Sequence, residues 1–144
     1  MPRLPERMEQ AWLLTARGLS EADAARELGT SRQAVNKAVR DARARLAAWF
    51  VEMAESLNAD LIRMDAVRGL AVMRSRQLAL RIYAIYVPGR GLRVIFGMEP
   101  LCPGRDGRRH CREVVEAARA LGLIEGLGEG IEDAVRGLIR VMES

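Results

Sequence analysis

Apolar residues recur at helical spacing from the start of the chain. Four of them are separated by three, one and four residues, namely Met8, Ala11, Trp12 and Ala16. This spacing puts them on one face of a helix. Pro5 suits the first turn of that helix, where its missing N–H costs nothing. The pattern predicts a helix over residues 5–17, which Gly18 ends.

A second, shorter helix is predicted immediately afterwards. Ser20 is a good N-cap, and the acidic residues that follow it complement the positive end of the helix dipole. The helix is expected to end at Leu28, because Gly29 can take the left-handed conformation that terminates helices.

A third helix is predicted from a cap at Thr30 or Ser31, with no breaker before Asn58. It is either one long helix or two helices nearly end to end. Its apolar stripe consists of Val35, Ala38, Val39, Ala42, Leu46, Trp49, Phe50 and Met53. We expect this stripe to lie in the core of this chain, with a seam for a second subunit as the alternative.

The pattern changes after Asn58. Residues 76–87 and 92–97 are dense in β-branched and aromatic side chains, and a Pro-Gly turn separates them, which predicts a β-hairpin. Residues 58–76 are ambiguous. We expect two short strands there that turn at Arg68–Gly69, with a broken helix as the alternative.

The end of the chain returns to helical patterns. We predict a loop over residues 98–110, a helix over 111–122, a glycine-rich link and a last helix over 131–143. Helices, then strands, then helices indicate an α+β fold. The expected organisation is an N-terminal helix-turn-helix domain, residues 1–57, followed by a small α+β lobe, residues 58–144. The lobe would hold a hairpin or meander and two C-terminal helices.

The first part of the chain has the residue types that a helix-turn-helix needs for packing. Ala25 is small where the two helices meet, Gly29 permits the turn, and Val35 supplies an aliphatic plug in the next helix. The spacings of four and six residues between them fit that motif. Leu28 fills the space beneath.

This packing turns one face of the third predicted helix outward. That face carries Ser31, Arg32, Gln33, Asn36, Lys37 and Arg40. Arg and Lys recognise guanine, and Gln and Asn recognise adenine, in the major groove of DNA. Arg43 and Arg45 suit contacts to phosphates, as does Ser31. The pattern favours a helix that reads duplex DNA, while the simpler alternative is a solvated basic face.

These residues also resemble a known family. GLSEADAARELGTSRQAV, residues 18–35, is similar to the archaeal Tfx family of transcriptional regulators, and residues 11–46 resemble the helix-turn-helix of LuxR-type regulators and sigma-factor region 4. The positions that match the Tfx pattern are Gly18, Leu19, Ala25, Leu28, Gly29, Thr30, Ser31 and Arg32. Ala24 is smaller than the family's residue, and residues 33–36 differ, so no operator sequence carries over. Over about the first 50 residues, the resemblance implies a DNA-binding domain followed by a separate C-terminal domain.

Charge is distributed unevenly along the chain. Residues 58–112 hold eleven basic and four acidic side chains, whereas residues 113–144 hold three basic and seven acidic ones. The middle is therefore suited to an anion. Arg105, Arg108, Arg109 and Arg112 gather at the start of a predicted helix. They could bind a small anionic effector or a DNA phosphate, or form a solvated basic loop.

The sequence gives little support for other classes of protein. No apolar run suggests a membrane span or a secretory signal, so we expect a soluble cytoplasmic protein. Cys102, His110 and Cys111 are too few for a structural zinc site, so we predict no metal and no cofactor. We expect two reduced thiols, with a Cys102–Cys111 disulfide as the alternative if the source is a hyperthermophile. No arrangement of catalytic residues is evident, and we predict no enzyme.

The sequence therefore predicts a transcriptional regulator that binds specific double-stranded DNA. We expect a homodimer, because one short helix reads too few base pairs for genomic specificity. The alternative is a protein-interaction module with a sigma-region-4-like domain that contacts RNA polymerase or another protein.

Overall fold

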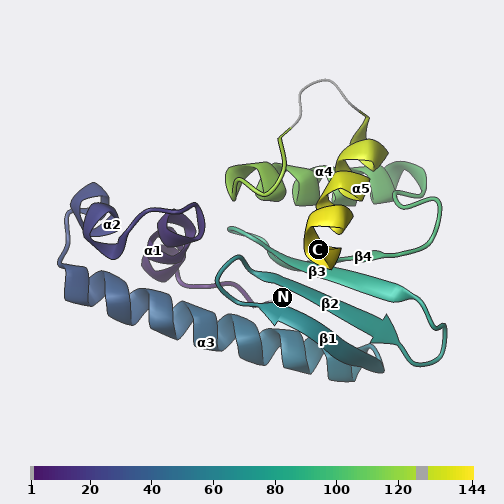
Figure 1. Ribbon diagram of the computed structural model, residues 1–144, viewed down its shortest axis with the longest axis horizontal. Coiled ribbons are helices and arrows are strands. Elements are labelled where there is room, and N and C mark those ends of the chain that lie inside the picture. The colour runs from purple at the N-terminus through teal and green to yellow at the C-terminus, as the bar shows by residue number, and fades with distance from the viewer. Residues whose placement is uncertain (1, 126–129) are drawn as a thin grey trace.

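The computed structural model describes residues 2–125 and 130–144, which form five helices and one four-stranded antiparallel sheet (Figure 1). The expected mixed α+β class is therefore confirmed. The helices are α1 (Glu6–Ala16), α2 (Glu21–Leu28), α3 (Arg32–Ser56), α4 (Gly104–Ala120) and α5 (Ile131–Glu143). The strands are β1 (Ala59–Asp65), β2 (Leu70–Ser75), β3 (Arg81–Val87) and β4 (Gly91–Phe96). None of the helices in these ranges is long and apolar enough to cross a membrane.

The strands form a meander in the order β1-β2-β3-β4. Residues 58–76 thus contain two strands rather than a broken helix, and the turn between them includes Arg68 and Gly69, as expected. A bulge interrupts the register of edge strand β1 between Leu61 and Arg63. Strand β3 lies in the interior of the sheet, and six of its seven residues are buried, because helices cover both of its faces.

The helices form layers on the two sides of the sheet. Figure 1 shows α3 along one face and α4 and α5 against the other. Two tyrosines of β3 point to opposite faces of the sheet and contact the helices on each side. Tyr86 packs against Trp49 of α3, with ring centroids 6.2 Å apart, whereas the hydroxyl of Tyr83 donates to Glu143 of α5 at 2.7 Å.

One hydrophobic core joins the N-terminal helices to the sheet. Trp12, Leu46 and Phe50 are fully buried in the same cluster as the strand residues and the apolar faces of α4 and α5. The stripe along α3 is therefore core of this chain, as expected. The expected domain boundary, between residues 57 and 58, follows the end of α3, and the main core crosses it.

A second, smaller core lies between α1, α2 and the start of α3. It consists of Ala11, Ala24, Ala25, Val35 and Val39, with Leu14, Leu28 and Ala38 packed against it. Two of the predicted packing residues, Ala25 and Val35, are buried there at 5% and 1% exposure, and Leu28 is partly buried. This cluster holds α1, α2 and the start of α3 together.

Helix α1 is also fixed to the sheet by polar contacts. The indole nitrogen of Trp12 donates to the carbonyl of Ala66 at 3.0 Å. The hydroxyl of Tyr86 donates to Glu9 and accepts from the backbone N–H of Leu4. Burial raises the pKa of Tyr86 above its usual value, so this hydroxyl stays protonated and can donate. These contacts set the position of the N-terminal helices relative to the strands.

Two predictions about the C-terminal lobe were wrong in extent. Residues 104–110, expected in a loop, form the first turns of α4. Pro103 is the N-cap of α4. Gly107 lies so close to Cys102 that an added Cβ would be 2.8 Å from its carbonyl carbon. Strand β3 begins at Arg81 rather than at residue 76. The residues before it form the β2–β3 turn, in which Ala79 has a positive φ of 52°. Residues 126–129 of the predicted glycine-rich link lie outside the described residues.

Candidate functional site

The start of α3 is held in place by local features of the sequence. The hydroxyl of Ser20 accepts from the N–H of Asp23 and caps α2, and Gly29 ends α2 with a φ of 66°. The hydroxyl of Ser31 then accepts from the N–H of Ala34 at 3.1 Å and caps α3. The chain therefore changes direction within three residues, Gly29 to Ser31. This short turn places α2 against the first turns of α3.

A polar hollow of about 460 Å³ lies on the exposed side of these turns. Its lining comprises Glu21 of α2 and five residues of α3: Arg32, Gln33, Asn36, Lys37 and Arg40. All five α3 side chains are exposed. The structure thus gathers all five of the predicted base-reading residues in one surface feature. Three cations and one carboxylate give this polar hollow a net charge of +2, which favours an anionic ligand.

Two of these five side chains are engaged by carboxylates. The amide nitrogen of Asn36 lies 3.0 and 3.2 Å from the two carboxylate oxygens of Glu21. The ammonium group of Lys37 lies 3.0 Å from Asp41, one turn further along α3. The hydrogen bond from Lys37 lowers the pKa of Asp41 below its usual value, so Asp41 is ionised at neutral pH.

The three residues expected to contact phosphates lie in different surroundings from one another. Ser31 caps α3, and its hydroxyl hydrogen remains free to donate. Arg43 follows Arg40 by three positions and Asn36 by seven, so it lies on the same side of α3. It is only partly exposed, and its Nε is buried with no hydrogen-bond partner among the described residues. Arg45 follows Asp41 by four positions, on another flank of α3. Neither arginine lines the polar hollow, and of the two only Arg45 is exposed.

Glu21 is the site residue that sequence reasoning missed. As the first residue of α2, it was interpreted only as a partner for the helix dipole. Its proximity to Asn36 depends on how α2 crosses α3, which a pattern along one helix does not reveal. The predicted helix-turn-helix was the only available signal, since such a motif packs two helices against each other across a short turn.

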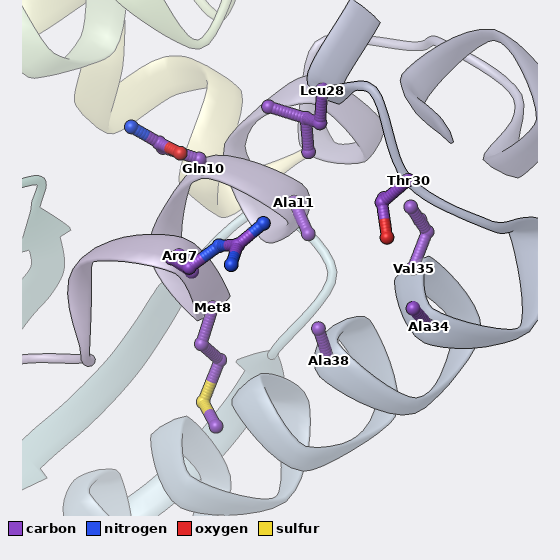
Figure 2. Close-up of a pocket in the computed structure, with 9 residues that line it drawn as sticks. All are labelled: Arg7, Met8, Gln10, Ala11, Leu28, Thr30, Ala34, Val35 and Ala38. Atoms are coloured by element: carbon purple, nitrogen blue, oxygen red, sulfur yellow. The ribbon is translucent and has the colours of Figure 1, made fainter. Parts of the chain in front are cut away.

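A second hollow, of about 270 Å³, lies on another side of α3 (Figure 2). Figure 2 shows Arg7 and Met8 of α1, Thr30 of the turn, and Ala34 and Ala38 of α3 around it. Most of its lining is apolar, and it includes none of the predicted base-reading side chains. The polar hollow is therefore the candidate site.

The arginine cluster of α4 is a separate feature. Arg105, Arg108, Arg109 and Arg112 are all exposed on the first turns of α4. Helix α4 lies across the sheet from α3 (Figure 1), so these arginines and the polar hollow do not form one site. Arg109 lies 3.7 Å from Asp106 in an exposed pair. Anion binding by this cluster stays a prediction.

The two cysteines form a disulfide, Cys102–Cys111, so the expectation of two reduced thiols was wrong. The helical start of α4 brings Cys111 back over the residues that precede the helix. A ring nitrogen of His110 lies 2.6 Å from the carbonyl oxygen of Val94, to which it donates. Across the described residues, no group of three or more His, Cys, Asp or Glu side chains is arranged to hold a metal ion.

Comparison of the chain with family models, curated proteins and solved structures finds no match. The resemblance to Tfx-type regulators therefore rests on residues 18–35 alone.

Proposed function

We propose that this chain is a sequence-specific regulator of transcription that binds double-stranded DNA with the first turns of α3. In this proposal α2, the turn at Gly29 and α3 form a helix-turn-helix, and α3 enters the major groove. The observation that carries the proposal is the polar hollow, where Arg32, Gln33, Asn36, Lys37 and Arg40 are exposed together. These are the side chains that recognise base edges.

Packing supports the same proposal. A recognition helix must present one face to DNA while the opposite face is anchored in its own domain. Val35 and Val39 anchor α3 in the smaller core at 1% exposure each, whereas Arg32, Asn36 and Arg40 are exposed. Arg43, partly exposed one turn beyond Arg40, is the proposed phosphate contact.

A homodimer is part of the proposal. The proposed base-reading residues of α3, Arg32 to Arg40, span about two turns and can contact only a few base pairs. A second copy is therefore needed for a site of useful length. Light scattering on the purified chain measures this directly. A dimer mass supports the proposal, and a monomer at micromolar concentration, with and without duplex DNA, contradicts it.

The test of DNA binding compares wild type with Arg32→Ala and Arg119→Ala. Both variants remove one exposed arginine, but Arg119 lies in the last turn of α4, across the sheet from α3. We expect Arg32→Ala to weaken binding to a selected duplex by about 1–3 kcal/mol. Arg119→Ala should bind as wild type does.

The measurement is fluorescence anisotropy at several salt concentrations, since contacts to phosphates make affinity fall steeply with salt. Equal affinity of Arg32→Ala and wild type would contradict the proposal. Binding to a protein partner that survives both Arg32→Ala and Lys37→Ala would favour the interaction module instead.

A further inference from the structure

Glu21 and Asn36 come from different helices but line the same hollow. The amide nitrogen of Asn36 lies 3.0 Å from Oε2 and 3.2 Å from Oε1 of Glu21. The pair joins the first residue of α2 to the second turn of α3, at the centre of the proposed DNA-binding face.

The chemistry of this pair fixes the direction of the Asn36 amide. An ionised carboxylate only accepts hydrogen bonds, whereas an amide has two N–H donors on one side and a carbonyl acceptor on the other. Turning the amide over would place its oxygen against the negative charge of Glu21. The nitrogen of Asn36 is therefore held towards α2, and its oxygen is directed away from Glu21.

The groups left free match one base. Both oxygens of Glu21 can share one N–H of Asn36, the one directed away from the amide carbonyl. That arrangement leaves the carbonyl oxygen and the second N–H for a base. Adenine presents a donor at N6 and an acceptor at N7 in the major groove, and an asparagine amide pairs with both at once.

We infer that Glu21 is a positioning residue that sets the preference of Asn36 for adenine at one position of each half-site. This inference rests on the proposed function. Glu21 also places a negative charge beside Arg32, Lys37 and Arg40, which lowers the attraction of the face for any phosphate backbone. Its presence there favours specificity over general affinity.

Glu21→Gln tests this role, because it keeps the shape of the side chain. A glutamine can accept from the nitrogen of Asn36 or donate to its oxygen, so either direction of the amide is allowed. The matched control is Glu27→Gln, which removes the same charge from an exposed position near the end of α2. Asn36→Ala identifies which base position depends on Asn36.

Each protein is used to select sites from a random duplex library, and the base preference is compared position by position. We expect wild type and Glu27→Gln to prefer adenine at the position that Asn36→Ala disrupts. Glu21→Gln should lose at least about fivefold of that preference. Adding Glu21→Gln to Asn36→Ala should change this position no further, because both act through one side chain. All variants should melt within a few degrees of wild type, since the residues are at the surface.

An unchanged adenine preference in Glu21→Gln, at a position that Asn36→Ala does disrupt, would overturn this inference and leave the proposed function standing. Loss of a cytosine preference at a different position would also overturn it, because Glu21 would then contact a base directly. If the wild-type protein enriches no site at all, the proposed function fails and the inference falls with it.

Discussion

Single residues of the proposed DNA-binding face are held by acidic neighbours. Lys37 pairs with Asp41 at 3.0 Å, and their side chains are 72% and 40% exposed. An ion pair so exposed contributes little to stability. Lys37 can therefore exchange Asp41 for a phosphate or a guanine at small cost. In the proposed function, Asp41 competes with the DNA for Lys37.

Replacing Asp41 by Asn tests this competition. The change frees Lys37 and removes a negative charge from the binding face, so we expect severalfold tighter DNA binding and a steeper salt dependence. Glu52→Gln is the control, because Glu52 is an exposed carboxylate far along the same helix. Affinities from anisotropy titrations at two salt concentrations decide the result. An equal gain in both variants would mean that net charge alone, and not the pair with Lys37, is responsible.

A buried hydroxyl gives a pH dependence at the residue scale. Burial, together with the hydrogen bond to Glu143, raises the pKa of Tyr83 from 10.0 to about 12. The folded state therefore holds this proton more tightly than the unfolded state. The stability that results is fully present below about pH 10 and is lost as the pH rises towards 12.

Urea unfolding of wild type and Tyr83→Phe measures this effect. At pH 9 we expect the variant to be less stable by about 1 kcal/mol, since it lacks the hydrogen bond. At pH 11 the difference should become smaller, because only wild type loses stability through Tyr83. Tyr86 is present in both proteins and cancels. The same difference at both pH values would contradict the account of Tyr83.

At the scale of elements, the turn between β1 and β2 supports the N-terminal helices. Gly69 has a φ of 71°, and a Cβ placed there would lie 2.9 Å from a ring carbon of Trp12 and 3.3 Å from Cβ of Tyr86. The turn thus packs against the indole of Trp12 in α1. The indole nitrogen donates to the carbonyl of Ala66 in the same turn. This contact couples α1 to the sheet.

Gly69→Ala should destabilise the protein more than Gly89→Ala does. Both glycines have positive φ, at 71° and 76°, so both variants carry the backbone strain of about 1 kcal/mol. Only at Gly69 does the new methyl group meet an aromatic ring, whereas nothing lies within 4 Å at Gly89. Chemical unfolding, followed by tryptophan fluorescence, gives both free energies. Equal losses would show that the packing of Trp12 on this turn adds nothing.

The elements that the sequence predicts well are those that local signals specify. Ser20, Gly29 and Ser31 give α2 and the start of α3, because capping and left-handed glycines act within a few residues. The start of α4 was missed because Gly104 and Gly107 are turn formers that here lie in a helix, covering Cys102. Burial of Ala25 and Val35 followed from spacing, but the contact between Glu21 and Asn36 depends on the packing of two helices, which no local pattern encodes.

For the whole molecule, the distribution of charge and core is informative. The main core runs from Leu4 to Met142, so α1, α3 and the α+β lobe are packed as one structure. Helix α3, which carries the polar hollow, and helix α4, which carries the arginines, lie against opposite faces of the sheet (Figure 1). A ligand at α4 would therefore have to act on α3 through this shared core and not by direct contact.

The central claim is that the exposed face of α3 reads duplex DNA, and selection from a random duplex library tests it most directly. The wild-type chain is used at about 0.15 M salt, where non-specific attraction to phosphates is damped. The account predicts enrichment of a two-fold symmetric site, with half-sites about one helical turn of DNA apart or a multiple of it. A folded protein that enriches no sequence would contradict the account.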